Sequence, residues 1–331
     1  MFEIGKIPPK ILEDIVFHTI KNGKVHRKEV VFGPKTGEDC CGIAYEDEIC
    51  VVSSDPITGA SDDIGYLAVQ INCNDIFSSG AEPIGILLTV LLPKNSSEDD
   101  LQTIMQGAMR GANELGIEIL GGHTEVSDAV IKPLVSATVL GKVKKDGFIS
   151  TGGGRVGQDI VMSKFAGLEG TSILTHEHTE VLRKRGMSEE LIAQGKSMKT
   201  MLSVGVESKI ATAHGVFAMH DVTEGGIFGA VWEVATCSGL GVKLYEEKIP
   251  LLEATKLVCQ LGGISPFTLI SSGVLLMVTD DGNALVEKLK QADIPSALIG
   301  KLTEGDCILI KKDGEVPLAE PQGDALYDCK F

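Results

Sequence analysis

Apolar runs and segments of helical periodicity follow one another along the first half of the chain. The runs have the composition of β-strands and cover residues 49–53, 84–92, 118–120 and 134–143. Two segments with apolar residues at helical spacing lie between them, at residues 63–79 and 97–116. The second starts with Ser97 and carries Asp100 three residues later, which is the pattern of a capping box. Alternating strands and helices predict an α/β domain.

Three consecutive glycines at positions 152–154 separate the two halves, because such a run cannot support a core element. Beyond them we expect a helix near residues 227–237 and strands at residues 216–219, 242–245, 273–278 and 297–301. Residues 168–203 are polar and helical with a charged middle, which favours an insertion on the surface. The sequence therefore predicts two α/β domains of comparable size, residues 1–150 and 151–331.

The composition is that of a globular protein and excludes several other classes. Of 331 residues, 43% are hydrophobic and 23% are charged, which excludes a disordered chain, a coiled coil and a collagen-like repeat. Thirty Lys and Arg stand against 46 Asp and Glu, so the formal net charge is −16. Such a chain has no general attraction to nucleic acid or to anionic lipid. It can still bind a nucleotide if a divalent metal neutralises the phosphates.

Neither a signal peptide nor a membrane span is expected, and the cysteines indicate a cytoplasmic protein. Charged residues interrupt the first 20 positions, and the longest uncharged run, residues 257–279, contains Pro266 and several glycines. Eight cysteines form no CxxC pair, so we interpret them as reduced core residues. The adjacent Cys40 and Cys41 leave a reactive or metal-binding pair as the alternative.

Three aspartates of the first half interrupt apolar surroundings. Asp39 precedes a short predicted strand, Asp55 follows the run at 49–53, and Asp75 interrupts an apolar helical stretch. Burial of a carboxylate is costly unless it is paired or binds a cation, and three converging carboxylates would suit Mg²⁺. The alternative is that each aspartate caps a helix or lies in a solvated turn.

Two glycine pairs follow predicted strands. Gly121-Gly122, before His123 and Thr124, could form a turn where the backbone approaches a ligand, although a structural turn explains it equally.

The second pair, Gly225-Gly226, lies in the segment 220–226 between a strand and a helix, where ligands bind in open α/β sheets. There the helix amides favour an anion while Asp221 and Glu224 could hold its metal. An N-cap formed by Thr223 is the alternative. The sequence contains no GxSxG, HExxH or GxxxxGK[ST] motif, so a nucleotide would bind without a P-loop.

The order of these motifs resembles the AIR synthase-like (PurM-like) superfamily over roughly residues 6–312, and it is most similar to the hydrogenase maturation protein HypE and AIR synthase-related proteins. The resemblance rests on an ordered set of segments: residues 37–39, 53–55, 74–75, 79–83, 121–124 and 221–226. It implies an N-terminal α/β domain, a C-terminal α+β domain, and a homodimer whose N-terminal sheets pack into a barrel.

The resemblance also implies an ATP site with Mg²⁺, and it assigns roles to residues by position. Asp39, Asp55 and Asp75 match metal-binding carboxylates, and Asp221 and Glu224 match the metal ligands of the second domain. The nucleotide and its phosphates would be contacted by Ser53, Ser54, Gly121, Gly122, Thr124, Thr223 and Gly225. Asp62 matches a position that contacts the acceptor in the kinases of the superfamily.

Two positions depart from the family pattern. His123 stands where the family has Asp or Glu, and an imidazole suits Mg²⁺ less well than a carboxylate does. HypE carries its substrate on a C-terminal cysteine, whereas here Cys329 is followed by two further residues.

Three functional hypotheses follow from this resemblance. The first is phosphoryl transfer from ATP to a carbonyl or amide acceptor, either a small molecule or protein-borne. The second is hydrogenase maturation, in which a carbamoyl-transfer partner protein delivers a group to Cys329. The third is an ATP-binding regulatory homodimer without catalysis, which His123 would favour.

Overall fold

The computed structural model describes residues 7–58, 63–321 and 323–331, and these form two compact units. Unit 1 consists of Met1–His26, Pro34–Glu38 and Ile149–Phe331; unit 2 consists of Arg27–Gly33 and Asp39–Phe148. The chain passes from unit 2 back to unit 1 between Phe148 and Ile149. This is two residues before the domain boundary expected after residue 150. The described residues 7–26 and 34–38, by contrast, are grouped with the second part of the chain.

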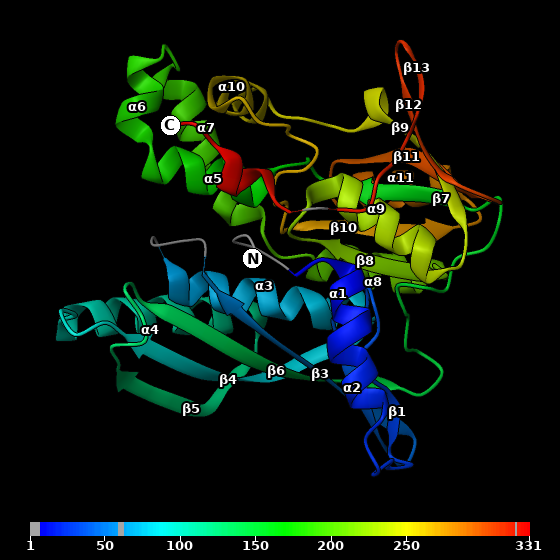
Figure 1. Ribbon diagram of the computed structural model, residues 1–331, viewed down its shortest axis with the longest axis horizontal. Coiled ribbons are helices and arrows are strands. Elements are labelled where there is room, and N and C mark those ends of the chain that lie inside the picture. The colour runs from blue at the N-terminus through cyan, green and yellow to red at the C-terminus, as the bar shows by residue number, and fades with distance from the viewer. Residues whose placement is uncertain (1–6, 59–62, 322) are drawn as a thin grey trace. The chain divides into compact units, whose positions relative to one another are not determined.

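Unit 2 is a sheet with its helices on one side (Figure 1). Among the described residues the strand order is β1-β2-β3-β6-β4-β5, and only β4 and β5 pair in parallel. Its elements are β1 (Val30–Phe32), β2 (Cys41–Tyr45), β3 (Glu48–Ile57), α3 (Ile64–Ser78), β4 (Glu82–Leu92), α4 (Glu98–Leu115), β5 (Glu118–Val126) and β6 (Leu134–Lys144).

Helix α3 is the centre of the unit 2 core. It contacts β3, β4 and β6 on one side and α4 on the other, and each of its residues is buried. A helix covered on both sides is apolar all round, as the sequence of α3 is apart from a few polar residues. Helix α4 begins with the expected capping box, in which Ser97 accepts from the Asp100 amide and Asp100 accepts from the Ser97 amide. That prediction is confirmed.

The other face of this sheet is covered by no element of unit 2 among the described residues. Burial alternates along β6, where Val135, Ala137 and Val139 are buried and their neighbours are half-buried. On the open face the side chains of Leu87 and Ile84 are 40% and 49% exposed. Apolar side chains on both faces of the strands explain why the strand runs in this half are nearly continuous in the sequence.

Unit 1 contains a second, largely antiparallel sheet. Among the described residues its strand order is β13-β12-β9-β11-β7-β10-β8. The strands are β7 (Asp159–Ser163), β8 (Ala218–Val222), β9 (Gly241–Tyr245), β10 (Val274–Thr279), β11 (Ser296–Thr303), β12 (Cys307–Lys311) and β13 (Gly314–Pro317). The helices are α1 (Pro9–Ile11), η1 (Leu12–Phe17), α2 (His18–Lys21), α5 (Leu168–Glu177), α6 (Thr179–Lys184), α7 (Glu189–Ser197), η2 (Met198–Met201), α8 (Gly205–His214), α9 (Gly226–Cys237), η3 (Glu246–Lys248), α10 (Glu253–Gly262), α11 (Gly282–Gln291) and η4 (Ala325–Asp328).

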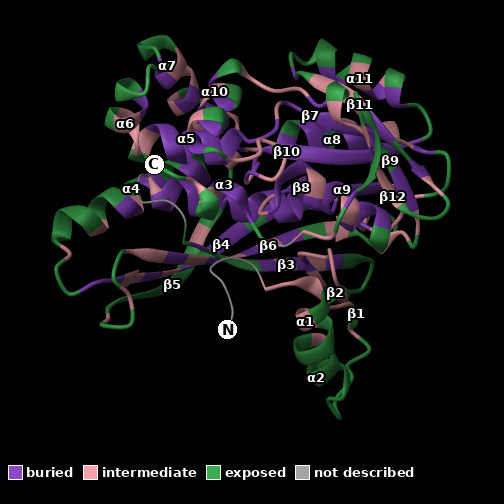
Figure 2. Ribbon diagram, turned by 45° about the horizontal axis from the view of Figure 1, so that its top comes forward, coloured by how far each residue is buried: buried purple, intermediate pink, exposed green. Residues whose placement is uncertain are grey.

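The helices expected to form a surface insertion, α5 to η2, instead pack into the core of unit 1. Leu168, Leu174, Leu182 and Met198 of this group are at most 2% exposed and belong to the same apolar cluster as the sheet. Figure 2 shows the buried side of α5 against the rest of the unit. The prediction was wrong because only the charged middle of the segment, in α6 and α7, is exposed, while the apolar side chains of these helices are buried.

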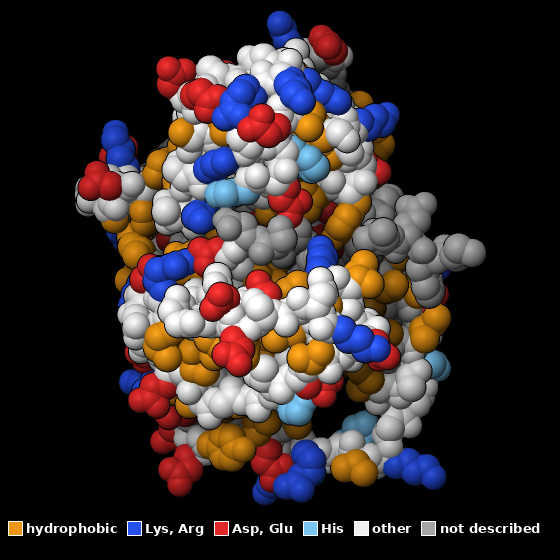
Figure 3. Space-filling model, turned by 90° about the vertical axis from the view of Figure 1, so that its left-hand side faces the viewer, with side chains coloured by type: hydrophobic (Ala, Val, Ile, Leu, Met, Phe, Trp, Pro, Cys, Tyr) orange, Lys and Arg blue, Asp and Glu red, His pale blue; other side chains and the backbone are white. Residues whose placement is uncertain are grey.

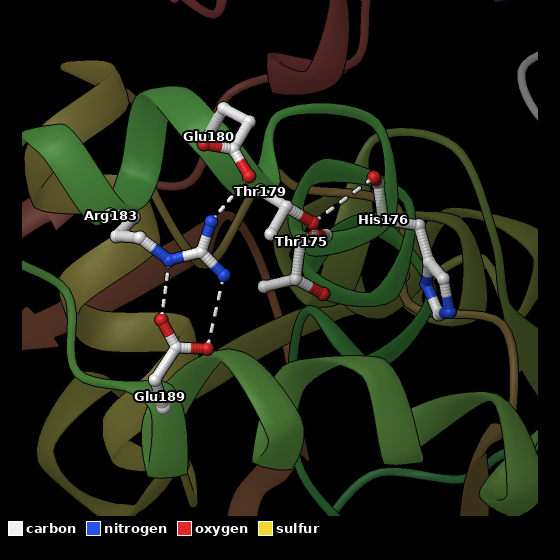
Figure 4. Close-up of polar contacts among 6 residues, drawn as sticks. All are labelled: Thr175, His176, Thr179, Glu180, Arg183 and Glu189. Carbon is white, nitrogen blue, oxygen red and sulfur yellow. Dashed lines mark hydrogen bonds and ion pairs between the residues drawn. The ribbon is translucent and has the colours of Figure 1, made fainter.

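Those charges pair with one another on the outside of the helices. Arg183 donates from Nη2 to Glu189 at 3.1 Å and also contacts Glu180, as Figure 4 shows. Where α5 passes into α6, the Thr179 hydroxyl donates to the carbonyl oxygen of Thr175 at 2.6 Å. In Figure 3 acidic and basic side chains are mixed over this face rather than separated.

Two strands extend further along the chain than the sequence predicts, and they include residues that we expected in the following turns. Strand β5 continues through Gly121, Gly122 and His123, so the expected Gly-Gly turn is wrong. Gly122 has φ +143°, and a Cβ there would lie 1.8 Å from the carbonyl oxygen of Leu88, so the pair permits close approach of β4. Strand β8 includes His220 and Asp221, which are both buried.

All eight cysteines are free, and Cys40, Cys73 and Cys259 are buried. No helix in the described part of the chain combines the length and apolar character needed to cross a bilayer.

Candidate functional site

One group of sequence-predicted residues meets between β3 and α3 in unit 2. Residues 53 and 55 lie on the same side of β3 because side chains alternate along a strand. Ser53 donates from its hydroxyl to Oδ2 of Asp75 at 2.5 Å, and the Asp55 amide donates to Oδ1 of Asn72 at 2.9 Å. Asn72 and Asp75 are three residues apart and therefore share one face of α3. The structure thus joins the side chains of Ser53 and Asp75 and holds the main chain at Asp55 beside the same face of α3.

The main chain at Asp39 is held to the same place. The Ser53 hydroxyl also lies 3.0 Å from the carbonyl oxygen of Asp39, and the Cys40 thiol donates to the carbonyl oxygen of Asp75 at 3.2 Å. Asp39 is half-buried, Asp55 is exposed and Asp75 is 3% exposed. This part of unit 2 is therefore rich in oxygen atoms, some exposed and some buried. Its carboxylates suit a hard divalent cation.

Ser54 and His123 lie on the opposite face of this sheet. The Ser54 hydroxyl is 2.8 Å from Oγ1 of Thr138, its neighbour across the strands. His123 is exposed and its Nε2 lies 3.1 Å from Oε2 of Glu125. Within one chain, neither residue joins the group around Asp75. Gly121, Gly122 and Thr124 are also exposed on β5, at the edge of the sheet.

The second group of predicted residues lies at the end of β8 in unit 1. Asp221 is 1% exposed, whereas Thr223 and Glu224 form a half-buried turn before α9. Thr223 does not cap α9: the N-cap is Gly225, without a side-chain hydrogen bond. The alternative interpretation of Thr223 as an N-cap is therefore wrong.

The amide at the start of α9 binds a carboxylate of the chain itself. Oδ2 of Asp324 accepts from the Gly225 amide at 2.8 Å, and its Oδ1 accepts from the Leu326 amide at 2.8 Å. Burial raises the pKa of Asp324 to about 6, with a further contribution from Glu224, although the backbone hydrogen bonds oppose the rise. The Tyr327 hydroxyl donates to Glu224 at 3.3 Å. The sequence offered no signal for Asp324, because it contacts α9 from about 100 residues away.

Glu169 is the other buried carboxyl of this region. It is 4% exposed, and burial raises its pKa to about 7, with Asp324 and Glu224 adding to the rise. The Ser272 hydroxyl is close enough to oppose part of it, but makes no hydrogen bond of standard geometry. Among the described residues, no donor reaches Oε2 of Glu169. Because this pKa is about 7, the Glu169 carboxyl is only partly ionised near neutral pH.

Cys329, the predicted carrier residue, is packed against unit 1. A Cβ on Gly262 would lie 2.6 Å from Sγ of Cys329. The amide of the following residue, Lys330, donates to the carbonyl oxygen of Gly262 at 3.1 Å. Burial raises the pKa of the Cys329 thiol, and the charge of Arg185 opposes this only in part. The predicted acceptor residue Asp62 lies outside the described residues.

Protein-family models match both halves of the chain. The model described as "AIR synthase related protein, N-terminal domain" matches residues 37–143, and the corresponding C-terminal domain matches residues 155–311. A Methanocaldococcus jannaschii protein named for hydrogenase expression/formation is 25% identical over 332 residues, covering 96% of each chain. Carbamoyl dehydratase HypE of Escherichia coli is 25% identical over 280 residues, which are 81% of this chain and 80% of HypE.

The fold is also found among solved structures. A structure of ThiL complexed with AMPPCP and TMP superimposes with a TM-score of 0.75, covers 98% of both chains and is 19% identical. At this identity the similarity establishes the fold alone, and the chemistry has to be argued from the residues described above.

Proposed function

The chain belongs to the family of AIR synthase-related proteins, and from this membership we propose that it is an ATP- and Mg²⁺-dependent enzyme of phosphoryl transfer. Its acceptor would be a carbonyl or amide oxygen, which becomes a leaving group once phosphorylated. ThiL was solved with AMPPCP, a non-hydrolysable analogue of ATP, and this supports a nucleotide as the ligand.

The observation that carries the proposal is the contact of the Ser53 hydroxyl with buried Asp75, beside the main chain of Asp39 and of Asp55. These carboxylates fit Mg²⁺, since oxygen ligands from one or two carboxylates together with substrate phosphates are its usual environment. We propose Asp39, Asp55 and Asp75 as the residues that would hold it. The ion would neutralise charge on the phosphates, as in other phosphoryl transfers.

The remaining residues of the group act on the carboxylates. Ser53 orients Asp75 by donating to its Oδ2, and Asn72 fixes the end of β3 by accepting from the Asp55 amide. Such fixed groups lower the cost of reorganisation when the charge distribution of the substrate changes. In unit 1, Asp221, Thr223, Glu224 and Gly225 are proposed to contact the metal–nucleotide complex as the family resemblance implies.

We further propose that the open face of the unit 2 sheet pairs with a second copy of the chain. Leu87 and Ile84 are exposed on it, and exposed apolar patches mark interaction sites. Such a homodimer would also cover Ser54 and His123, which no residue of the carboxylate group reaches in one chain. Sedimentation should give a dimer for the wild type and a monomer for Leu87→Lys, and a wild-type monomer would contradict this pairing.

The direct test is incubation with ATP and Mg²⁺, followed by separation of ATP, ADP and AMP on an ion-exchange column. ADP that forms with Mg²⁺ and not with a chelator would support the proposal. Mg²⁺-dependent binding of ATP, without product for any carbonyl or amide acceptor tried, would favour the regulatory alternative. The absence of both binding and product would overturn the proposal.

Hydrogenase maturation is the second candidate, favoured by the names of two relatives. It would require the segment that carries Cys329 to leave Gly262, and a carbamoyl-transfer partner protein to load the thiol. Mass spectrometry after incubation with ATP, a carbamoyl donor and such a partner would detect the added mass. An unmodified Cys329 under conditions in which ATP is consumed would exclude this candidate.

A further inference from the structure

The turn at residues 36–38 is the last part of unit 1 before Asp39, where the chain passes into unit 2. The chain returns to unit 1 at Ile149, two residues before Thr151. Within unit 1 these two segments are joined, because the Thr151 amide donates to Oε1 of Glu38 at 3.2 Å. The main chain that leads into Asp39 is thus fixed by a contact that lies outside unit 2.

Gly37 packs tightly against α9. It has φ +73°, and a Cβ there would lie 2.4 Å from Sγ of Cys237 and 3.5 Å from Cβ of Glu233. The Cys237 thiol donates to the carbonyl oxygen of Thr36 at 2.8 Å. Only glycine fits this position, because its φ is positive and a side chain would clash with α9. The turn at residues 36–38 is therefore held in one position against the helix.

A buried histidine–carboxylate pair, His220 and Glu233, is connected to the same turn through Thr151. Nε2 of His220 is 3.0 Å from Oε2 of Glu233, on the neighbouring helix α9 (Figure 1). The two residues are 2% and 9% exposed. A carboxylate only accepts, so Nε2 carries the hydrogen, and Nδ1 can accept from the Thr151 hydroxyl 3.5 Å away. The contacts form a relay from Glu233 through His220 and Thr151 to Glu38.

Stability alone does not account for this relay. Replacement of a buried polar pair by apolar residues is often neutral or even stabilising, whereas a polar network specifies one arrangement of its members. The arrangement specified here is that of the turn at residues 36–38, one residue before a proposed metal carboxylate.

We propose that His220 and Glu233 are positioning residues that fix this turn through Thr151 and Glu38, and so fix the main chain at Asp39 for metal binding. The inference rests on the proposed function, since it takes Asp39 as a metal ligand. Glu233 does not touch the metal and acts only through His220. Partners that orient ligands in this way commonly contribute about 10- to 100-fold to metal affinity.

The test measures metal affinity rather than turnover. Mn²⁺ replaces Mg²⁺ at oxygen sites, and electron paramagnetic resonance of free Mn²⁺ gives its affinity in the presence of AMPPCP. Glu233→Ala should weaken Mn²⁺ binding at least about tenfold, and Glu233→Gln, which keeps an acceptor for Nε2–H, should recover most of the loss. Thr151→Val and Thr151→Ser form a second pair with the same expectation.

Glu207→Ala is the matched control. Glu207 is 2% exposed and pairs with Lys164 at 2.5 Å in the same unit, so its loss destabilises unit 1 without touching the turn. Its Mn²⁺ affinity should equal that of the wild type. If Glu207→Ala weakens binding as much as Glu233→Ala does, the effect is general destabilisation and the inference is wrong.

The outcomes also separate this inference from the proposed function. A wild-type protein that binds no Mn²⁺ with AMPPCP overturns the proposed function and the inference together. A wild type that binds, with unchanged affinity in Glu233→Ala and Thr151→Val, overturns the inference alone. Should Glu233→Ala fail to fold, the Thr151 pair decides by the same criterion, because it removes a single hydroxyl.

Discussion

In unit 2 the buried carboxylate of Asp75 accepts a hydrogen bond from Ser53, whereas in unit 1 the buried carboxyl of Glu169 lies close to those of Asp324 and Glu224. Both regions have acidic side chains in places that favour apolar ones. In unit 2 the neighbours are donors and Asp55 is open to solvent, so a cation can complete the group. In unit 1 the neighbours are further carboxyls and no donor within the described residues reaches Oε2 of Glu169, so a proton completes it.

The comparison separates two roles for acidic residues that look alike in the sequence. Asp39, Asp55 and Asp75 are candidates for binding a metal, whereas Glu169 and Asp324 respond to pH, and Asp324 also holds the C-terminal segment near α9.

Loss of a carboxylate in unit 2 should remove catalysis with little change in stability. Asp55→Asn keeps the shape and the exposed position but loses the charge, so Mg²⁺-dependent ADP formation should fall about 100-fold. The control is Asp128→Asn, because Asp128 is another exposed aspartate and pairs with Lys94 on the surface. Turnover in Asp55→Asn equal to that of the control would refute the role given to this carboxylate.

Unit 1 should lose stability as its carboxyl group ionises. The pKa of Glu169 is raised to about 7 from an ordinary value of 4.5, so its contribution is complete below pH 4.5 and is lost as the pH rises through about 7. Between pH 5 and 8 the resulting loss in unfolding free energy is roughly 2 kcal/mol. Denaturant titrations of Glu169→Gln, which cannot ionise, should show a flatter pH dependence than the wild type.

An equal pH dependence in the wild type and Glu169→Gln would mean that other groups control the stability of unit 1 in this range.

Ser53 and Ser54 test the two faces of β3. Ser53→Ala leaves buried Asp75 without its hydroxyl donor and should destabilise unit 2 by about 1.5 kcal/mol. Ser54→Ala is the matched control on the exposed face and should change the unfolding free energy by at most about 0.5 kcal/mol. Urea denaturation measures both. Equal losses in the two variants would show that the contact between Ser53 and Asp75 contributes nothing special.

The smallest effect is expected at the C-terminal segment. Tyr327→Phe removes one hydrogen bond to Glu224 at a side chain that is 39% exposed, and should cost about 0.5 kcal/mol. A thermal scan at pH 6 measures it. A loss above about 2 kcal/mol would mean that Tyr327 anchors the segment more strongly than the acidic group near α9 does.

The sequence predicted most elements of the fold because their signals are local. The strand runs of the first half, the helix at residues 63–79 and the cap at Ser97 depend on residues a few positions apart. The errors arose where long-range contacts decide. Gly121 and Gly122 extend a strand because β4 approaches them closely, and residues 168–203 are polar on one side only, which their average composition conceals.

The candidate site was predictable in part for the same reason. Asp55 and Asp75 interrupt apolar runs, and this was enough to single them out. Asn72 and the pair of His220 with Glu233 gave no signal, since a polar residue in a buried element has a meaning only once its partner is known. Asp324 contacts Gly225 across 99 positions of sequence, a distance that no local pattern spans.

The central claim is that the carboxylates of unit 2 bind ATP together with Mg²⁺, and a thermal-shift titration of the wild type and Asp55→Asn tests it most directly. A ligand at a hundredfold excess over its Kd stabilises the folded state by about 2.7 kcal/mol. The account predicts a shift of this order for the wild type with ATP and Mg²⁺, little shift when a chelator replaces Mg²⁺, and little shift in Asp55→Asn. A wild type that ATP and Mg²⁺ do not stabilise, or an equal shift in Asp55→Asn, would contradict it.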